Sequence, residues 1–413
     1  MRGRVLSRFR VFSLCLFLIV AAAICVKSNS ISGAHQLYED GGENIARSHT
    51  DNRIILGTQT LTSEDHKVTE IAAAVELTRI RAAKLDSISN ESLFNNDKNL
   101  PVSTIKFRPE ELVTALAWSP DGASLAIAAG DRVYLYDSQS LMAHNVLRIG
   151  AFTNSLAFSS RGDWLAAGSR DGMLRVWKFE DIIESDGGVE VDPFWTLEAH
   201  KKGVNSVTFN KDGDLLASGG VDAIVRLWDV NTGEESGTLI GGTFSVPGIA
   251  FDPETPLLAI VNGDFIRLRD SLTQQIWGTI RAQSPQYSIT YSPDGSLLVS
   301  SDIANRIYIW DPEAAFRTGV ETYPVPVILE GHKGLVGTYR GLVWQVEFHP
   351  DGKFLASAGG DGTVRLWEIA SGNLLRTLNA HTAAVTSLAY SPDGRKLASG
   401  SLDGRVFIWD VDS

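Results

Sequence analysis

Hydrophobic and polar positions follow one another in short blocks along most of the chain. The last block, SPDGRKLASGSLDGRVFIWDV at 391–411, shows the pattern clearly. SPDG is a turn signal, because proline fixes φ and Asp-Gly tolerates the left-handed conformation of a tight corner. A short apolar run follows, then a second turn signal, SLDG, and then the strand-forming run VFIW. The block predicts two β-strands, half of a four-stranded sheet, and such a unit must stack on copies of itself to bury both faces.

Imperfect copies of this block fill the chain from about residue 101 onward. The aromatic position at the end of the last strand in each block is occupied in turn by Tyr136, Trp177, Trp228, Arg269, Trp310, Trp367 and Trp409. The intervals between these positions are 41, 51, 41, 41, 57 and 42 residues. A period near 42 with turns at fixed offsets resembles the WD-repeat family, whose repeats build a β-propeller. The resemblance covers about 310 residues and implies an all-β fold, a seven-bladed β-propeller over 101–413.

Two intervals are long because loops are inserted. The stretch FEDIIESDGGVEVD after Trp177 is acidic and rich in turn residues, which predicts a longer loop there. The longest interval combines extra residues between Trp310 and Ile328 with an insertion of seven near Gly334 to Gly341.

Three repeats carry the full polar set that is characteristic of the WD-repeat family. These sets are His200, Ser218, Asp222 and Trp228; His332, Ser357, Asp361 and Trp367; and His381, Ser399, Asp403 and Trp409. Ser, His and Asp together can form a hydrolase triad, but a triad occurs once in an enzyme, whereas this set recurs in three repeats. The family resemblance implies a structural chain instead, in which Asp holds His, His reaches Ser, and Ser reaches the Trp ring nitrogen. A zinc site is not expected, because each His belongs to a different blade.

The other four repeats are degenerate. The Trp177 repeat keeps Asp171 but has Ala167 at the serine position and no histidine, and the Trp310 repeat has Ser300 but Ala304 where aspartate is expected. The first and fourth repeats, IAAGDRVYLYD and IVNGDFIRLRD, have a shorter turn. We expect these blades to be held by packing without the hydrogen-bond chain, and so to be the softer part of the ring.

The last repeat stops just after its third strand. Residues 102–108, VSTIKFR, precede the first repeat and occupy the place that RTLNAH and WTLEAH hold before theirs. We therefore predict that this N-terminal segment supplies the missing outer strand of the last blade, which closes the ring and covers an exposed edge.

Charge and cysteine content exclude several classes of function. The formal charge is −12, and because residues 1–27 carry five positive charges and no negative one, the remainder carries −17. An acidic body argues against nucleic acid or an anionic membrane surface as the main ligand. Both cysteines, Cys15 and Cys25, lie within the first 27 residues, so the rest has no disulfide, thiolate nucleophile or cysteine metal site.

The chain begins with four arginines in MRGRVLSRFR, followed by 16 uncharged, mostly apolar residues, Val11 to Val26. This pattern predicts that 1–27 is a signal peptide or a short signal anchor, with the rest of the protein outside the cytoplasm. Sixteen residues are just short of a bilayer span, so cleavage and retention both remain open. Residues 28–100 are a polar linker, with a possible short helix over 62–85 that would serve as a spacer, a docking helix or a helix lying on the propeller.

The WD-repeat resemblance implies a non-catalytic interaction scaffold or adaptor that binds protein partners, rather than an enzyme. No phosphate loop, metal cluster or single acid–base pair stands out in the sequence, so we predict no cofactor and no metal. Two alternatives remain open: an extracytoplasmic propeller with a small-molecule or enzymatic pocket in its channel, and a membrane-tethered sensor module.

The rim of the ring offers a candidate binding surface. In this family the loop after the outer strand and the tight turn that holds the Asp lie on the same rim. The inserted loop, KGLVGTYRGLVW, carries Leu335, Val336, Tyr339 and Arg340 there, and Tyr and Arg are enriched at interface hot spots. The residues before the turn aspartates would extend this patch: Arg170, Val221 and Leu402. The loop could equally fold over the channel and bury its own apolar side chains.

Overall fold

The computed structural model describes residues 99–185, 191–315, 326–334 and 341–411. The predicted signal segment at 1–27, the possible helix at 62–85 and nearly all of the 28–100 linker lie outside these residues. Within the described part of the chain, no helix has the length and apolar character needed to cross a membrane.

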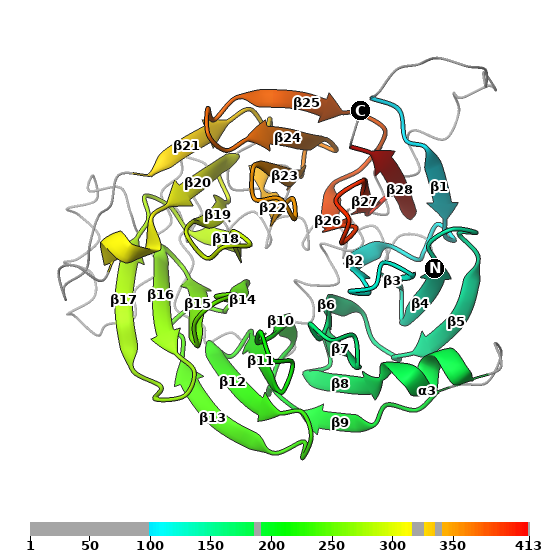
Figure 1. The fold of residues 1–413 in the computed structure, drawn as a ribbon, viewed down its shortest axis with the longest axis horizontal. Helices are drawn as coiled ribbons and strands as arrows, with labels where there is room; N and C mark the ends of the chain where they lie inside the picture. Colours follow the sequence, from blue (N-terminus) through cyan, green and yellow to red (C-terminus); the bar gives the residue numbers. More distant parts are fainter. Residues whose placement is uncertain (1–98, 186–190, 316–325, 335–340, 412–413) are drawn as a thin grey trace, which may run out of the picture. The chain divides into compact units, whose positions relative to one another are not determined.

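Seven four-stranded antiparallel sheets form a ring, as Figure 1 shows, and the predicted seven-bladed β-propeller is confirmed. In each of the first six blades the four strands follow one another in sequence from the centre of the ring outward. Their bounds, blade by blade, are β2 (Val113–Trp118), β3 (Ser124–Ala129), β4 (Arg132–Asp137), β5 (Ala143–Arg148); β6 (Thr153–Phe158), β7 (Trp164–Ser169), β8 (Met173–Lys178), β9 (Trp195–Glu198); β10 (Val204–Phe209), β11 (Leu215–Gly220), β12 (Ile224–Asp229), β13 (Glu235–Ile240); β14 (Ile249–Phe251), β15 (Leu257–Asn262), β16 (Phe265–Asp270), β17 (Ile276–Arg281); β18 (Gln286–Tyr291), β19 (Leu298–Asp302), β20 (Arg306–Trp310), β21 (Val327–Glu330); and β22 (Val343–Phe348), β23 (Phe354–Gly359), β24 (Val364–Glu368), β25 (Leu374–Leu378).

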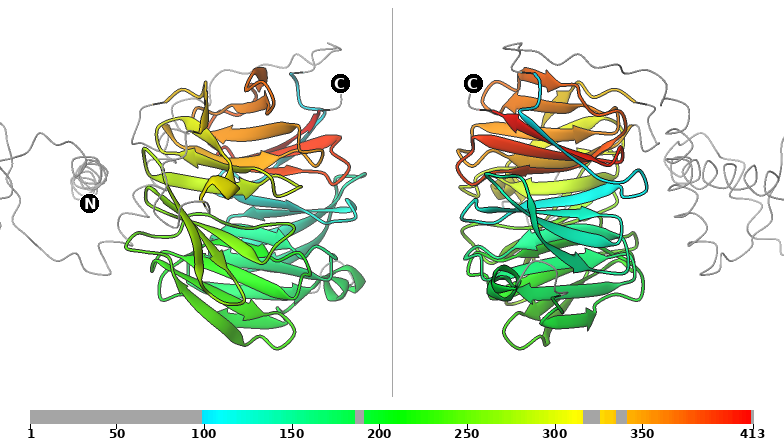
Figure 2. Two further views of the ribbon diagram at one scale, coloured as in Figure 1. Left: turned by 60° about the vertical axis from the view of Figure 1, so that its left-hand side comes forward. Right: turned by 90° about the vertical axis from the view of Figure 1, so that its right-hand side faces the viewer.

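The seventh blade joins the two ends of the propeller. Its strands β26 (Val385–Tyr390), β27 (Lys396–Ser401) and β28 (Arg405–Asp410) come from the end of the chain, and β1 (Ser103–Lys106) completes it. β1 pairs antiparallel with β28, with Ile105 opposite Val406, and the Val102 N–H extends the ladder to the Ile408 carbonyl at 2.8 Å. The predicted ring closure is therefore confirmed, and Figure 2 shows β1 beside the red strand β28.

The core of the propeller lies between the blades. Seven clusters of buried apolar side chains form, and each cluster combines residues of two neighbouring blades. The aromatic residue of a repeat faces the blade before it: Trp177 belongs to the cluster between blades 1 and 2, and Trp409 to the cluster between blades 6 and 7. This geometry explains why one repeat could not fold alone, because half of its apolar surface has no partner within the repeat.

The turns that begin each repeat also contact the neighbouring blade. In the SPDG turn of blade 7, Gly394 has φ +74°, the left-handed region that favours glycine. A Cβ at this position would lie 2.4 Å from Nε2 of His349 in blade 6. Glycine is thus favoured here both by the turn conformation and by the close approach of blade 6.

The acidic insertion after Trp177 differs from the expected loop. It begins with a short helix, α3 (Phe179–Glu184), whose Phe179 and Ile182 are buried in the cluster between blades 1 and 2. Phe179 packs edge-on against Phe158, with ring centroids 4.9 Å apart. Phe179 and Ile182 of FEDIIE therefore serve packing, while Ile183 and the carboxylates of the same helix are exposed.

Candidate functional site

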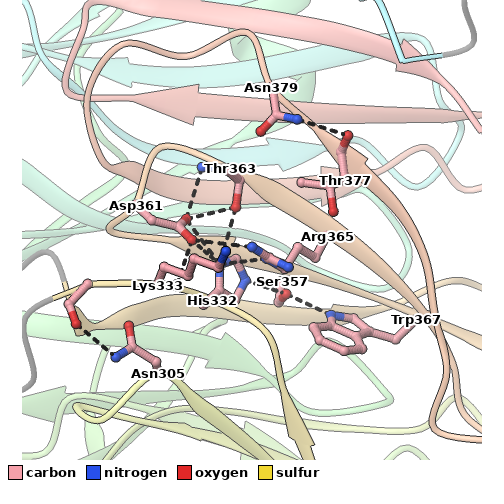
Figure 3. A network of polar contacts seen from close by, with 11 residues as sticks. Asn305, His332, Lys333, Ser357, Asp361, Thr363, Arg365, Trp367, Thr377 and Asn379 are labelled. Carbon is pink, nitrogen blue, oxygen red and sulfur yellow. Dashed lines mark hydrogen bonds and ion pairs between the residues drawn. The ribbon is translucent and has the colours of Figure 1, made fainter.

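The three complete polar sets form continuous hydrogen-bond chains in the structure. In blade 6, Nδ1 of His332 lies 3.1 Å from Oδ1 of Asp361, and Nε2 lies 2.8 Å from Oγ of Ser357. Nε1 of Trp367 donates to the same Ser357 oxygen at 2.8 Å (Figure 3). Because Trp can only donate, the serine hydroxyl is left to donate to Nε2, and the imidazole N–H is then directed at the carboxylate.

The other two sets have the same geometry. His200 lies 2.8 Å from Asp222 and 3.0 Å from Ser218, which accepts from Trp228 at 2.9 Å. In blade 7, the corresponding atoms of His381 lie 3.2 Å from Asp403 and 2.8 Å from Ser399, and Trp409 donates to that serine at 2.8 Å.

In blade 6, burial and hydrogen bonding together set the protonation states of His332 and Asp361. Burial lowers the pKa of His332, although the hydrogen bond to Asp361 acts in the opposite direction. Burial disfavours the charged form of Asp361, but hydrogen bonds from His332 and the Lys333 backbone N–H outweigh it and hold the pKa of the carboxyl well below its usual range. The chain is therefore a neutral imidazole held by an ionised carboxylate.

These sets are built for packing and not for reaction with a substrate. The serines Ser218, Ser357 and Ser399 have no exposed surface. A hydroxyl enclosed on all sides, and already bonded to both Trp and His, cannot approach a substrate carbonyl. Their chemistry is the pairing of buried polar groups, which is costly to leave unmade.

Blade 5 corrects the expectation that degenerate repeats lack a polar chain. Trp310 donates to Ser300 at 2.8 Å, and Ser300 donates to Oε1 of Gln286 at 2.5 Å, so a glutamine replaces the histidine. The carboxylate of this blade is Asp302, two positions before Ala304, and Ser284 links it to Gln286. Gln286 donates to the Ser284 carbonyl at 2.9 Å, and the hydroxyls of Ser284 and Tyr308 donate to Asp302 at 2.5 and 3.0 Å. The sequence comparison missed this chain because its residues occupy shifted positions.

In blade 2, the stretch inserted after Trp177 supplies the acceptor for the tryptophan N–H. With Ala167 at the serine position, Nε1 of Trp177 donates instead to the backbone carbonyl of Val191 at 3.1 Å. Asp171, the remaining member of the set, pairs with Arg175 at 2.8 Å. Packing alone therefore does not hold this blade either.

Blade 4 is the one in which the aromatic position carries a charge. Arg269 replaces Trp, and its Nε is buried with no hydrogen-bond partner among the described residues. Burial lowers the pKa of Arg269, and the positive charge of Arg267 adds to this effect. An unpaired buried donor is destabilising, so the expected softness remains a prediction for this blade.

A second set of polar contacts links the innermost strands. Side-chain oxygens of one blade accept the backbone N–H of the next blade at 2.9–3.3 Å in five of the seven junctions, and the acceptors are Ser155, Ser206, Ser288, Gln345 and Ser387. Sequence reasoning missed these residues, although each stands three positions before the aromatic residue that ends its strand. At the other two junctions the position holds Ala115 and Gly248, which have no polar side chain.

Glu347 is the single carboxylate on the seven innermost strands, and sequence reasoning also missed it. Its oxygens accept from the Tyr390 backbone N–H and from the Gln345 amide, both at 3.0 Å. Burial raises the pKa of Glu347 to about 8, against the lowering effect of the Tyr390 N–H. Burial raises the pKa of the Tyr390 phenol, the charges of Glu347 and Asp351 add to this effect, and the charge of Arg376 opposes it.

The candidate binding residues have different surroundings. Arg170 is exposed, Val221 is partly buried, and Leu402 is only 6% exposed, so Leu402 adds little to the surface of the rim. All three stand just before the second turn of their repeats, as expected. Leu335, Val336, Tyr339 and Arg340 lie outside the described residues. Within the described ranges there is no group of three or more His, Cys, Asp or Glu residues placed to hold a metal ion.

Comparison with known proteins shows that the chain is similar to WD-repeat proteins. The family model "WD domain, G-beta repeat" matches five segments, at 139–178, 192–229, 275–311, 326–368 and 372–410. Similar curated proteins include WD repeat-containing protein SL1-17 of Schistosoma mansoni (30% identical; 51% of this chain, 64% of the relative). Others are a serine-threonine kinase receptor-associated protein of Gallus gallus (27%; 61% and 65%) and a guanine nucleotide-binding protein subunit beta of Arabidopsis thaliana (27%; 67% and 62%). The chain thus spans less than two thirds of each of these relatives.

The polar chains predict specific losses of stability. Asp361→Ala and Asp403→Ala should each lower the free energy of unfolding by about 1–3 kcal/mol, because a buried histidine loses its partner. Asp171→Ala is the matched control: it removes the same turn residue from a blade without histidine, and should cost no more than about 1 kcal/mol. Urea unfolding of the purified full chain measures all three, and equal stability of the wild type and both histidine-blade variants would show that the chains contribute nothing.

Glu347 predicts a dependence of stability on pH. Its folded pKa lies above the unfolded value, so its stabilising contribution is complete below about pH 4 and is lost as the pH rises through about 8. Glu347→Gln imitates the protonated side chain and does not titrate. The free energy of unfolding of the variant, relative to that of the wild type, should therefore increase by about 2–4 kcal/mol between about pH 5 and pH 9. Glu254→Gln changes an exposed carboxylate and serves as the control. Parallel pH profiles for wild type and Glu347→Gln would contradict the assignment.

Proposed function

Because this chain belongs to the WD-repeat family and is a protein-interaction propeller, we propose that it acts as a non-catalytic scaffold or adaptor that binds partner proteins with the rim of the ring. The observation that carries the proposal is that the serine of every complete Ser–His–Asp set is fully buried and bonded to both its Trp and its His. The recurring polar residues stabilise the platform, which leaves the loops and turns of the rim as the variable surface.

The names of the relatives support this function. They describe a receptor-associated protein, a subunit of a guanine nucleotide-binding protein and a subunit of a chromatin assembly factor. Such names belong to components of assemblies. Because the chain spans less than two thirds of each of these relatives, their partners are not assigned to it.

An enzymatic or ligand-binding channel is the alternative in another class. Its requirement would be two unlike acid–base groups facing each other in the channel. Glu347 is the single carboxylate of the described innermost strands, and its two oxygens are engaged by Gln345 and Tyr390. This arrangement favours the scaffold.

We further propose that the propeller is displayed outside the cytoplasm, either exported or held by the N-terminal segment. The support lies in the sequence: four arginines precede the apolar run, and a single lysine follows it closely. If the segment is retained, the protein would be a membrane-tethered module, and the linker at 28–100 would separate the propeller from the bilayer.

The inserted loop predicts the first test of partner binding. Tyr339→Ala combined with Arg340→Ala should weaken the capture of a partner protein by the tagged full chain at least tenfold, without unfolding the ring. Thr232→Ala with Ser371→Ala, two exposed turn residues at the opposite end of the strands, is the control and should retain capture. Captured proteins are identified by mass spectrometry from the native membrane fraction. Full capture by the folded loop variant would place the binding surface elsewhere, with the acidic stretch at 178–193 on the opposite face as the next candidate.

The display of the propeller is tested separately with reporters at the C-terminus. A reporter that is active only outside the cytoplasm should be active, and one that is active only in the cytoplasm should be silent. Replacing Arg2, Arg4, Arg8 and Arg10 with glutamate should reduce or reverse this difference. Activity of the cytoplasmic reporter in the wild-type fusion would refute the proposed display, and the mass of the mature protein separates cleavage from retention.

A further inference from the structure

Three exposed cations gather on the rim where blades 2 and 3 meet. Arg170 stands in the turn between β7 and β8, and Lys201 and Lys202 stand in the loop between β9 and β10. We call these three residues the basic rim.

Backbone contacts hold the two segments of the basic rim together. The His200 N–H donates to the Gly172 carbonyl at 3.0 Å, which joins the loop to the turn. A Cβ on Gly172 would lie 2.7 Å from the Lys202 carbonyl, and one on Gly203 would lie 3.4 Å from Cα of Arg170. The three cations are therefore carried on a contiguous, ordered surface.

Arg170 is positioned without a carboxylate partner among the described residues. Its guanidinium lies 5.1 Å from the centre of the Phe152 ring, and its Nε donates to Oδ1 of Asn154 at 3.1 Å. The adjacent carboxylate of Asp171 is engaged by Arg175 at 2.8 Å. The charge of Arg170 is thus fixed in place and remains available to a partner, which reduces the entropic cost of binding.

The basic rim contrasts with the rest of the propeller. Residues 101–413 contain 25 Lys and Arg against 38 Asp and Glu. Where Arg170 stands before its turn aspartate, blades 3, 6 and 7 have Val221, Gly360 and Leu402. Two exposed carboxylates lie near in sequence: Asp171, which pairs with Arg175, and Glu198, two positions before His200. The three cations remain in excess. The positive charge is therefore local to one junction.

The charge of Arg170 also acts on an aromatic residue of another blade, Tyr287 on the innermost strand β18. Burial raises the pKa of Tyr287 to about 12, and the charge of Arg170 acts in the opposite direction. Tyr287 packs edge-on against Trp344, with ring centroids 5.5 Å apart, and both residues lie on innermost strands.

We propose that the basic rim docks an acidic, extended segment of a partner protein. The inference rests on the proposed function and specifies the chemistry of the partner. Carboxylates of such a segment would bind Arg170, Lys201 and Lys202, while the acidic remainder of the propeller repels it from other sites and so fixes where it binds. Three cations in an acidic protein suit a short peptide better than a nucleic acid, which would bring its phosphate backbone against the surrounding carboxylates.

The test uses the purified full chain and a fluorescein-labelled decapeptide of alternating Glu and Ser, followed by fluorescence anisotropy at low ionic strength. Replacing Arg170, Lys201 and Lys202 together with glutamate should weaken binding at least tenfold. The matched control replaces Arg161, Lys211 and Lys353 with glutamate, which makes the same change of charge in turns at the opposite ends of the strands. It should weaken binding less than threefold. A peptide of alternating Gln and Ser should not bind.

Several outcomes would overturn the docking site. These are absence of binding by the acidic peptide, equal losses in the two charge-reversal variants, or tighter binding of a labelled single-stranded oligonucleotide than of the peptide. The capture experiment separates this inference from the proposed function: a basic-rim variant that still captures the partner proteins of the wild type refutes the docking site and leaves the scaffold function standing. A wild-type chain that captures no partner refutes the scaffold function, whatever the peptide does.

Discussion

The structure depends on the burial of apolar surface between neighbouring sheets. Each four-stranded blade has two apolar faces, and each of the seven apolar clusters is shared by two blades. No blade is complete without its neighbours, so the arrangement is satisfied only when the ring closes. β1 has this role, because it completes the last blade with residues from the opposite end of the propeller. Closure of the ring is therefore a condition for the stability of every blade.

Burying a tryptophan between blades creates a second constraint, since its indole N–H must find an acceptor. The protein supplies an acceptor for this N–H in several ways. Ser357 accepts it in blade 6 with His332 and Asp361 behind it, Ser300 accepts it in blade 5 with Gln286 behind it, and the Val191 carbonyl accepts it in blade 2. The physical requirement is constant, while the residues that meet it vary. Blade 4 alone has no aromatic residue at this position. Its Arg269 has a buried Nε without a hydrogen-bond partner among the described residues.

Placing the histidines and serines between blades also decides where function can reside. Groups that would be reactive on a surface are used to hold the sheets, so recognition is left to the turns and loops at the ends of the strands. These segments connect adjacent blades on a fixed scaffold, and a charge such as that of Arg170 can be held by a ring and an amide without a carboxylate partner. An acidic protein can in this way present a local positive surface.

The sequence by itself determined the number of blades, the positions of the turns, the complete polar sets and the closing strand. It did so because these features are periodic or local: a turn needs Gly at a fixed offset, and a strand at 102–108 stands where other repeats have theirs. Only the tertiary structure decided the contacts that depart from this regular pattern. In blade 5, Gln286 and Asp302 replace absent residues from shifted positions. FEDIIE packs as a helix against the neighbouring blade, and Ser155 and Gln345 each bond to the blade that follows them. Such contacts leave a weak trace in the sequence, because two blades facing each other can satisfy a buried donor from any position that comes within about 3 Å of it.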